Sequence, residues 1–408
     1  MKSILIKSVL FFSFSPIFLF AQYTGTGKVS QGRATTTSTN IYTCPSGRIT
    51  SLGISTASDN STWIVPSANH FTDANFPFAS DLHNACIGAN FANATAALAA
   101  LNGNDIINID ASGEVYTAYI FADNYFELYV NGIPVGKDKV TYTQFNSSIV
   151  RFKVNSPFTM AMLLVDWEEN LGLGTELNGA APYHAGDGGL VCVVKNANNQ
   201  TIAISNNNWK AQTFYTSPIQ DLTCPSESGT LRLTSNCSTT DAANGENHYA
   251  IHWEIPANVM SSNFDDSDWP SASVYSNATV GVNNKPAYTN FTDIFDNSSN
   301  DAQFIWSSNL ILDNQVIVRY TVNAASGINE MEKAKIEIYP NPNDGNFSIY
   351  LPEQKKIENL KVFDLLGNLI FEDFTGEHKI NLTYLPKGMY ALKVKSDNEM
   401  YHKKIIIN

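Results

Sequence analysis

The stretch YIFADNYFELYVNGIPVG, residues Tyr119–Gly136, decides the fold class. Its second part alternates as a half-buried strand does, with three apolar residues on one face: Phe126, Leu128 and Val130. Asn131-Gly132 is the favoured pair for a two-residue type I′ turn, because both positions require positive φ. Pro134 cannot donate a backbone hydrogen bond, so the return strand should be short or lie at a sheet edge. The stretch predicts a hairpin in a β-sandwich.

Other segments support the same class. Residues 149–154 and 315–322 alternate in the same way, whereas FTMAMLLVDW, residues 158–167, is apolar almost throughout and is typical of a central strand. Only FANATAALAALNG, residues 91–103, favours a helix, which Gly103 should end. The sequence therefore predicts an all-β protein whose body is a jelly-roll or β-sandwich, built as one large sandwich or as two modules.

The first residues, MKSILIKSVLFFSFSPIFLFAQ, are typical of a secretory signal peptide. Lys2 and Lys7 start an apolar run that is short for a bilayer core of roughly 30 Å, and the small residue Ala21 suits cleavage. We expect residues 1–21 to be removed, which makes Gln22 the new N-terminus. No later segment is apolar for long enough to span a membrane, so we expect an exported protein without a transmembrane segment.

The charge distribution changes near residue 333. Residues 22–332 carry 12 Lys or Arg against 28 Asp or Glu, whereas residues 333–408 carry 11 against 10. The segment before this change, residues 323–332, is small and polar and is typical of a linker. Beyond it, alternating strands are separated by turn residues. Residues 333–408 should therefore form a small immunoglobulin-like β-sandwich.

Short motifs of this tail, in their order, resemble the type A C-terminal sorting domain of the type IX secretion system in Bacteroidetes. The matching pieces are Tyr339-Pro340-Asn341-Pro342, Gly345-x-Phe347, Phe363-Asp364, Gly367, Leu385-Pro386-Lys387-Gly388-x-Tyr390 and Lys403-Lys404-Ile405-Ile406. The resemblance implies that the type IX machinery is a partner of the tail. It also implies that the protein is secreted or held at the outer cell surface.

Two parts of the body resemble galactose-binding-like jelly-roll modules. One is the hairpin ADNYFELYVNGIPVG, residues 122–136. The other joins FDDSDWPSASVYS, residues 264–276, to AQFIWSSNLILDNQVIVRYTV, residues 302–322. In that family the acidic turn with its Trp comes before the hairpin, and here it follows. Two modules, residues 22–200 and 201–322, would explain this order, and so would a single larger sandwich.

The acidic body argues against nucleic-acid partners, because phosphates require clustered Lys and Arg. Neutral ligands or cations fit better, and calcium is the one cofactor that the sequence suggests. We expect the body to be a carbohydrate-binding module without catalytic activity. One alternative is a surface structural or adhesive protein that has no small ligand. A glycoside-active enzyme is disfavoured, because no carboxylate pair is convincingly placed.

Candidate ligand residues are of two kinds. Asp123 and Asn124 precede the hairpin strand, where their oxygens can bind calcium or a sugar hydroxyl, or can satisfy backbone donors at a bulge. Trp167 and Trp209 are the tryptophans that we expect at the surface, where an indole ring can stack on a sugar.

Two acidic groups are candidate calcium sites, because calcium takes oxygen ligands. Asp166 and Glu168 follow the central strand and, if that strand continued, would share a face about 6.6 Å apart. The alternative for this pair is a solvated acidic turn. The second group is Asp265, Asp266 and Asp268, for which an acidic capping turn is the alternative.

The glycine-rich loop PYHAGDGGL, residues 182–190, contains His184 and Asp187. No nucleophile lies beside them in the sequence, and the helix start that a phosphate-binding loop needs is missing. We interpret this loop as a turn.

Five cysteines lie in a chain that should enter a compartment where disulfides persist. Cys224 and Cys237 are close in the sequence and are the expected disulfide, and Cys44 with Cys86 is a second candidate pair. Cys192 lies in the apolar run GGLVCVV and is expected to be a free thiol in the core.

The two export signals predict a processed protein. Mass spectrometry of culture fractions should find a chain that begins at Gln22 and ends near the linker, in the medium or on the cell surface. A cytosolic species that retains residues 333–408 would contradict this route.

Overall fold

The structure is a computed structural model. It describes residues 23–408 except 46–47, 49, 68, 102, 143–144, 178–182, 241–244, 298–299, 324–335, 352–355, 365–367 and 397–398. The expected signal peptide lies outside the described residues, as does the expected linker apart from Asn323. The chain divides into two compact units, Met1–Ala324 and Ala325–Asn408, and each is described by itself.

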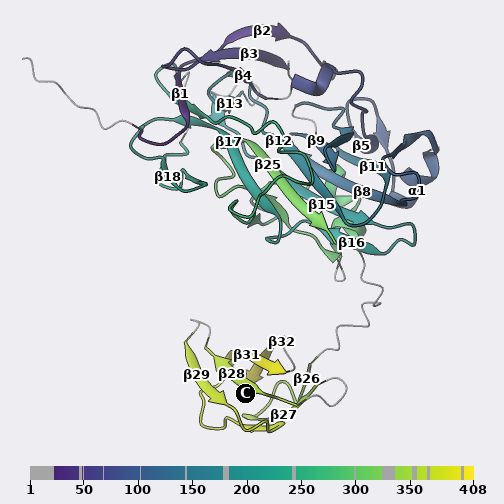
Figure 1. The fold of residues 1–408 in the computed structure, drawn as a ribbon, viewed down its shortest axis with the longest axis vertical. Coiled ribbons are helices and arrows are strands. Elements are labelled where there is room, and N and C mark those ends of the chain that lie inside the picture. The colour runs from purple at the N-terminus through teal and green to yellow at the C-terminus, as the bar shows by residue number, and fades with distance from the viewer. Residues whose placement is uncertain are drawn as a thin grey trace, which may run out of the picture. The chain divides into compact units, whose positions relative to one another are not determined.

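The larger unit is built around two sheets (Figure 1). The first sheet has seven strands, each antiparallel to its neighbours. Their order is β1 (Lys28–Gln31), β20 (Tyr249–His252), β17 (Lys210–Ile219), β25 (Asp313–Val322), β12 (Phe158–Val165), β9 (Tyr125–Val130) and β10 (Ile133–Lys137).

The second sheet has nine strands. Seven follow one path: β21 (Ser273–Tyr275), β24 (Phe304–Trp306), β15 (Gly189–Lys195), β8 (Glu114–Asp123), β11 (Ser147–Val154), β5 (Ser80–Asn84) and β6 (Ala89–Asn90). Two more pair beside this path, β16 (Thr201–Ile204) with β15 and β7 (Ile106–Asn108) with β11. The β7 pair is parallel, and the other pairs of this sheet are antiparallel.

Small elements cover the two sheets. The strands among them are β2 (Thr35–Thr39), β3 (Ser51–Thr56), β4 (Thr62–Val65), β13 (Thr175–Glu176), β14 (His184–Ala185), β18 (Ser226–Ser228), β19 (Leu231–Leu233), β22 (Asp296–Asn297) and β23 (Asn300–Asp301). The helices are α1 (Ala94–Ala100), α2 (Pro286–Thr289) and α3 (Thr292–Phe295), with 3-10 turns at Asn69–Thr72 and Gly103–Asp105. Helix α1 lies inside the one segment that favoured a helix, and the Asn93 side chain caps its N-terminus. The all-β class is confirmed.

The hairpin that decided the class is β9 and β10. Asn131 and Gly132 both have positive φ, 51° and 82°, as the two-residue turn requires. Strand β10 has five residues and ends the seven-stranded sheet, and its pairing with β9 is irregular between Pro134 and Gly136. Pro134, which has no backbone N–H to donate, thus lies in an edge strand, as predicted.

The seven-stranded sheet is buried on both of its faces. Along β12, Met162 and Leu164 face the core between the two sheets, and Leu163 and Val165 face a second apolar cluster on the other side. That second cluster is completed by aromatic side chains from the covering loops, among them Phe71, Tyr142, Trp253 and Trp269. The continuous apolar run of the sequence is therefore the central strand that it predicted.

Strands from before and after residue 200 pair directly in both sheets. Strand β25 lies between β17 and β12, and β24 pairs with β15 beside β8. The sequence left open one sandwich or two modules divided near residue 200. The pairing corresponds to one sandwich, because each of the two large sheets contains strands from both parts.

The chain changes sheets at Asp123 and Asn124. Strand β8 belongs to the nine-stranded sheet, and β9, which starts two residues later at Tyr125, belongs to the seven-stranded sheet. The corner therefore lies where the ends of the two sheets come together.

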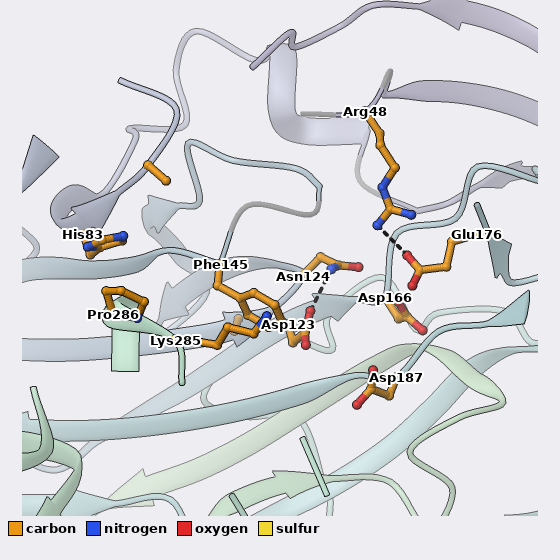
Figure 2. A pocket seen from close by; sticks show the side chains of 12 residues that line it. Arg48, His83, Asp123, Asn124, Phe145, Asp166, Glu176, Asp187, Lys285 and Pro286 are labelled. Atoms are coloured by element: carbon orange, nitrogen blue, oxygen red, sulfur yellow. Dashed lines mark hydrogen bonds and ion pairs between the residues drawn. The ribbon is translucent and has the colours of Figure 1, made fainter. Parts of the chain in front are cut away.

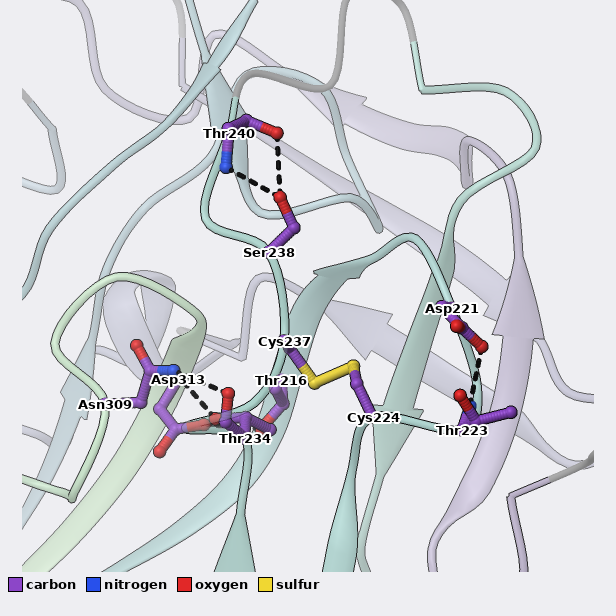
Figure 3. Close-up of a disulfide and its surroundings, with 10 residues drawn as sticks. All are labelled: Thr216, Asp221, Thr223, Cys224, Thr234, Cys237, Ser238, Thr240, Asn309 and Asp313. Atoms are coloured by element: carbon purple, nitrogen blue, oxygen red, sulfur yellow. Dashed lines mark hydrogen bonds between the residues drawn. A yellow bond between two sulfur atoms is a disulfide. The ribbon is translucent and has the colours of Figure 1, made fainter.

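Two disulfides join covering loops. Cys224 is bonded to Cys237, which closes the segment that carries β18 and β19 after β17 (Figure 3). Beside this loop the Asn309 side chain donates to the Thr234 hydroxyl at 2.8 Å. Cys44 is bonded to Cys86, and Cys192 is a free, fully buried thiol on β15.

The smaller unit has two antiparallel sheets around a core of its own. One contains β26 (Glu337–Tyr339), β27 (Asn346–Tyr350) and β30 (Lys379–Asn381). The other contains β29 (Leu369–Asp373), β28 (Asn359–Phe363), β31 (Gly388–Ser396) and β32 (Glu399–Ile407).

The hairpin predicts a contrast between its core and its turn end. Leu128 is fully buried, so Leu128→Ala should lower the free energy of unfolding by about 2–5 kcal/mol, because it leaves a cavity in the core. Ile133→Ala is the control, since Ile133 follows the turn, is 43% exposed, and its truncation should change stability by about 0.5 kcal/mol or less. Guanidinium unfolding measures both, and equal losses would contradict this difference in burial.

Candidate functional site

A pocket of about 500 Å³ lies at the sheet corner (Figure 2). Its carboxylates come from Asp123, Asp166, Glu176 and Asp187, and its cations from Arg48 and Lys285. His83, Asn124 and Phe145 are among the other lining residues. The pocket is therefore polar and contains more acidic than basic groups.

Strand topology brings three of these carboxylates to one end of the sandwich. Asp123 ends β8, Asp166 directly follows β12, and Asp187 lies two residues before β15. Strands β8 and β15 are antiparallel, so the end of the first lies beside the start of the second, and Asp123 is opposite Gly189. Strand β12 ends beside the start of β9, which continues directly from the Asp123 corner.

Asn124 holds this corner together. Its side-chain nitrogen donates to Asp123 Oδ1 at 2.7 Å, and its side-chain oxygen accepts from the Trp167 backbone N–H at 2.6 Å. Its own backbone N–H donates to the Val165 carbonyl at 3.2 Å. Asn124 thus satisfies backbone groups at the corner, whereas the second oxygen of Asp123 accepts no hydrogen bond from the described residues.

Asp166 is buried, and its carboxylate has no partner among the described residues. Its residue is 4% exposed, it lines the pocket, and its carboxylate has no hydrogen bond or ion pair with any described residue. A Cβ atom added to Gly186 would lie 2.9 Å from both oxygens of this carboxylate. A side chain at position 186 would therefore collide with the carboxylate, and glycine lets the Asp187 loop approach it.

Burial and mutual repulsion disfavour ionisation of these acids. Burial raises the pKa of Asp123 well above its usual range, and the charges of Asp187 and Glu176 raise it further. Burial also raises the pKa of Asp166 well above its usual range, with Glu176 and Asp123 adding to the effect. Burial and then Glu176 raise the pKa of Asp187 to about 6.

The two cations have different surroundings. Arg48 donates to Glu176 at 2.9 Å and to Glu169 at 3.3 Å, and its guanidinium lies 4.0 Å from the centre of the Tyr142 ring. Lys285 Nζ lies 4.4 Å from the centre of the Phe145 ring and has no ion-pair partner in the described part of the chain. Arg48 is therefore paired with its own acids, and Lys285, ahead of Arg48, is the cation that offsets the charge of Asp123.

The two tryptophans expected at the surface are core residues, so that expectation was wrong. Trp167 is 1% exposed and packs edge-on against Tyr125, at 6.2 Å between ring centres. Trp209 is fully buried, stacks on Tyr320 at 5.2 Å and donates to the Ile204 carbonyl at 2.8 Å. Trp167 follows β12 and Trp209 directly precedes β17, two strands of the sheet whose faces are both covered, so neither presents a ring to a ligand.

The two carboxylates that the sequence paired after β12 are separated. Asp166 lines the pocket, whereas Glu168 is buried, accepts from the Tyr215 hydroxyl at 2.7 Å and accepts from the Gly174 N–H. Burial raises the pKa of Glu168 to about 7. The chain leaves strand β12 at Asp166, so the alternation of faces ends there and the two carboxylates do not share a face. The hydrogen bonds of Glu168 hold the turn that follows.

The acidic turn before Trp269 has internal partners. Asp266 accepts from Arg319 Nε at 2.7 Å, and Asp265 accepts from the Ser267 N–H at 3.0 Å. Asp265 and Asp268 are exposed. Among the described residues no group of three His, Cys, Asp or Glu side chains is arranged to hold a metal ion.

Several pocket residues were not predicted from the sequence. Asp187 was interpreted as part of a turn, although its glycine neighbours indicated a close approach of the backbone. Glu176 ends the two-residue strand β13 and Arg48 lies in a loop, and neither stretch has an informative pattern. Lys285 precedes the short helix α2. Their contribution depends on which loops cover this end of the sandwich.

The tail matches a known family. Residues 337–408 match the model of the secretion system C-terminal sorting domain, which confirms the type IX assignment of the tail. The protein is accordingly secreted or held at the outer surface. The described residues include no helix long and apolar enough to cross a membrane.

Other likenesses to known proteins are partial or weak. The chain is 34% identical over 85 residues to an ulvan lyase, NLR42, of Nonlabens ulvanivorans, which is 20% of this chain and 16% of that protein's length. Among solved structures, a lectin from Pleurotus ostreatus in complex with GalNAc covers 74% of each chain at 10% identity, with a TM-score of 0.21. The BSP domain of a biofilm-associated protein covers 72% of this chain and 76% of its own, with a TM-score of 0.15. TM-scores this low do not define a shared fold.

The unpartnered Asp166 predicts a stability that depends on pH. Its raised pKa means that the folded state holds its proton more tightly than the unfolded state, so its ionisation costs stability as pH rises above the unfolded pKa of about 3.9. Asp166→Asn removes that cost, and it should raise the free energy of unfolding at pH 8 by about 1 kcal/mol or more.

Thermal melts of the full chain at several pH values measure this effect. The gain should shrink as pH falls towards the unfolded pKa of about 3.9, because the carboxyl is then protonated in the unfolded state as well as in the folded state. Asp265→Asn is the matched control, and it should bring no gain because Asp265 is exposed and its hydrogen bonds to Ser267 lower its pKa. A loss of stability in Asp166→Asn at pH 8 would contradict the interpretation.

Proposed function

We propose that residues 23–323 are a non-catalytic carbohydrate-binding module and that the pocket at the sheet corner is its sugar site. The observation that carries this proposal is the Asp166 carboxylate, which is 4% exposed, lines the pocket and lacks a hydrogen-bond partner among the described residues. Export by the sorting domain places such a module where it can meet polysaccharides outside the cell.

The pocket's chemistry asks for hydrogen-bond donors. An ionised carboxylate can accept hydrogen bonds but cannot donate them. Burying such a carboxylate without a hydrogen-bond donor lowers the stability of the folded protein. Sugar hydroxyls donate, and one sugar ring offers several of them to neighbouring carboxylates. The second oxygen of Asp123 and the carboxylates of Asp166 and Asp187 are therefore suited to a polyhydroxylated ligand.

Size and lining support a small ligand. A volume of about 500 Å³ lies within the range of about 300–1,000 Å³ that is usual for small-molecule sites. Phe145 supplies an apolar wall, and its ring is held by Phe121 at 5.8 Å between ring centres. In this proposal Phe145 has the sugar-contacting role that the sequence analysis expected of Trp167 and Trp209.

A glycoside-active enzyme is the second candidate. Asp187 has a pKa of about 6 and lies among other carboxylates. A carboxyl with a raised pKa beside an acidic neighbour suits the role of general acid in glycoside cleavage. Release of new reducing ends, or of unsaturated ends, from a bound polysaccharide would decide for catalysis.

Calcium remains a proposal for this protein. Carboxylate oxygens are its preferred ligands, and a sugar-bridging ion would draw them together. The binding experiments below are therefore run with added calcium and with a chelator.

The sugar site predicts binding that depends on pocket carboxylates. On a glycan array followed by calorimetry, the full chain should bind one group of glycans. Asp166→Asn and Asp187→Asn should each weaken binding by about 10- to 100-fold, as expected for a lost hydrogen bond to a charged group. Asp265→Asn removes the same charge from the exposed turn and should leave affinity unchanged.

Two outcomes would count against the proposal. If no glycan binds with or without calcium, the body is better explained as a structural or adhesive protein. If glycans bind equally to the wild type and to both pocket variants, the sugar site lies elsewhere.

A further inference from the structure

The pocket contains a charge imbalance that a neutral sugar does not remove. Asp123, Asp166 and Asp187 come together from three strand ends, and Arg48 is paired with Glu176 and Glu169. Lys285 also lines the pocket and lowers the pKa of Asp123, and its Nζ lies over the Phe145 ring without an ion pair in the described part of the chain.

We propose that the ligand is an amino sugar whose protonated amine lies among Asp123, Asp166 and Asp187. This inference rests on the proposed carbohydrate-binding function and names the class of sugar. A protonated amine offers three N–H donors and a positive charge, so it supplies hydrogen bonds and offsets the repulsion between the acids. A hydroxyl supplies the hydrogen bond alone.

Burial makes the attraction between that positive charge and the carboxylates stronger than it would be in water. Asp123 is 5% exposed and Asp166 is 4% exposed, so solvent screens neither carboxylate well. Burial, and then the charges of the neighbouring acids, disfavour the ionised forms of Asp123 and Asp166 and raise their pKa values. A cation bound among them reverses this effect.

An ammonium group suits such a pocket because it needs no full coordination shell. Calcium takes about six to eight oxygen ligands at close to 2.4 Å, whereas ammonium hydrogen bonds are longer and make no such demand on coordination. The pocket volume of about 500 Å³ also leaves room for the sugar that carries the amine.

The test compares hexosamines that have a free amine with their N-acetylated forms. Acetylation removes the charge and keeps the ring, so each pair is a matched control. Calorimetry with the full chain at pH 7 should give an affinity at least about 10-fold higher for the free amine, because a hydrogen bond to a charged partner is stronger.

Three variants assign the preference to this pocket. Asp166→Asn should reduce the ratio of the two affinities towards one. Lys285→Met should increase it, because the competing cation is removed. Asp265→Asn, in the exposed turn, should leave the ratio at its wild-type value. The opposite directions for Asp166 and Lys285 separate a charge effect from general damage to the pocket.

Other results would overturn the inference. Equal binding of free and N-acetylated sugars, weakened by Asp166→Asn, would leave the carbohydrate-binding function in place and remove the ammonium site. Neutral sugars that bind only with calcium would assign the acids to a metal. A preference for amines that survives in Asp166→Asn would assign it to another surface. Methylammonium binding without any sugar binding would retain the ammonium site and remove the carbohydrate function.

Discussion

The side chain of Asn124 bridges the point where the chain passes from one sheet to the other. It accepts from the Trp167 N–H and donates to Asp123, so it connects the segment after β12 with the end of β8. Strand pairing brings the ends of β8, β12 and β15 to this corner, and the amide then joins them across it. The pocket depends on this junction, because the amide holds Asp123 against the segment that follows Asp166.

Buried carboxylates at that corner are tolerated because the sandwich around them is large. The core between the sheets contains residues from nearly every long strand, and a second apolar cluster covers the far face of the seven-stranded sheet. A single unpaired acid costs a few kcal/mol at most when it can take up a proton, which is small beside the burial of two such clusters. An arrangement that opposes stability and persists is typical of a binding or catalytic site.

The same second cluster explains why tryptophans were poor guides to the site. Both faces of this sheet are covered, so side chains on either face of a strand are buried. An indole next to the end of such a strand is therefore buried as well. Trp167 packs against Tyr125 in this cluster, whereas Trp209 stacks on Tyr320 beside the other core. The aromatic ring that does line the pocket, Phe145, comes from a loop.

The sequence by itself determined the elements whose signals are local. Alternation around Leu128, the Asn131-Gly132 turn, the edge position of β10 and the sorting tail all follow from neighbouring residues, because strand faces and turn angles are set within a few positions. Only the tertiary structure decided which acids meet. Asp123, Asp166 and Asp187 are separated by tens of residues, and antiparallel pairing of β8 with β15 and of β9 with β12 places their strand ends together. The local sequence pattern also does not show which side chains are buried. In the structure Glu168 is buried and its hydrogen bonds hold a turn, whereas Asp166 faces the pocket.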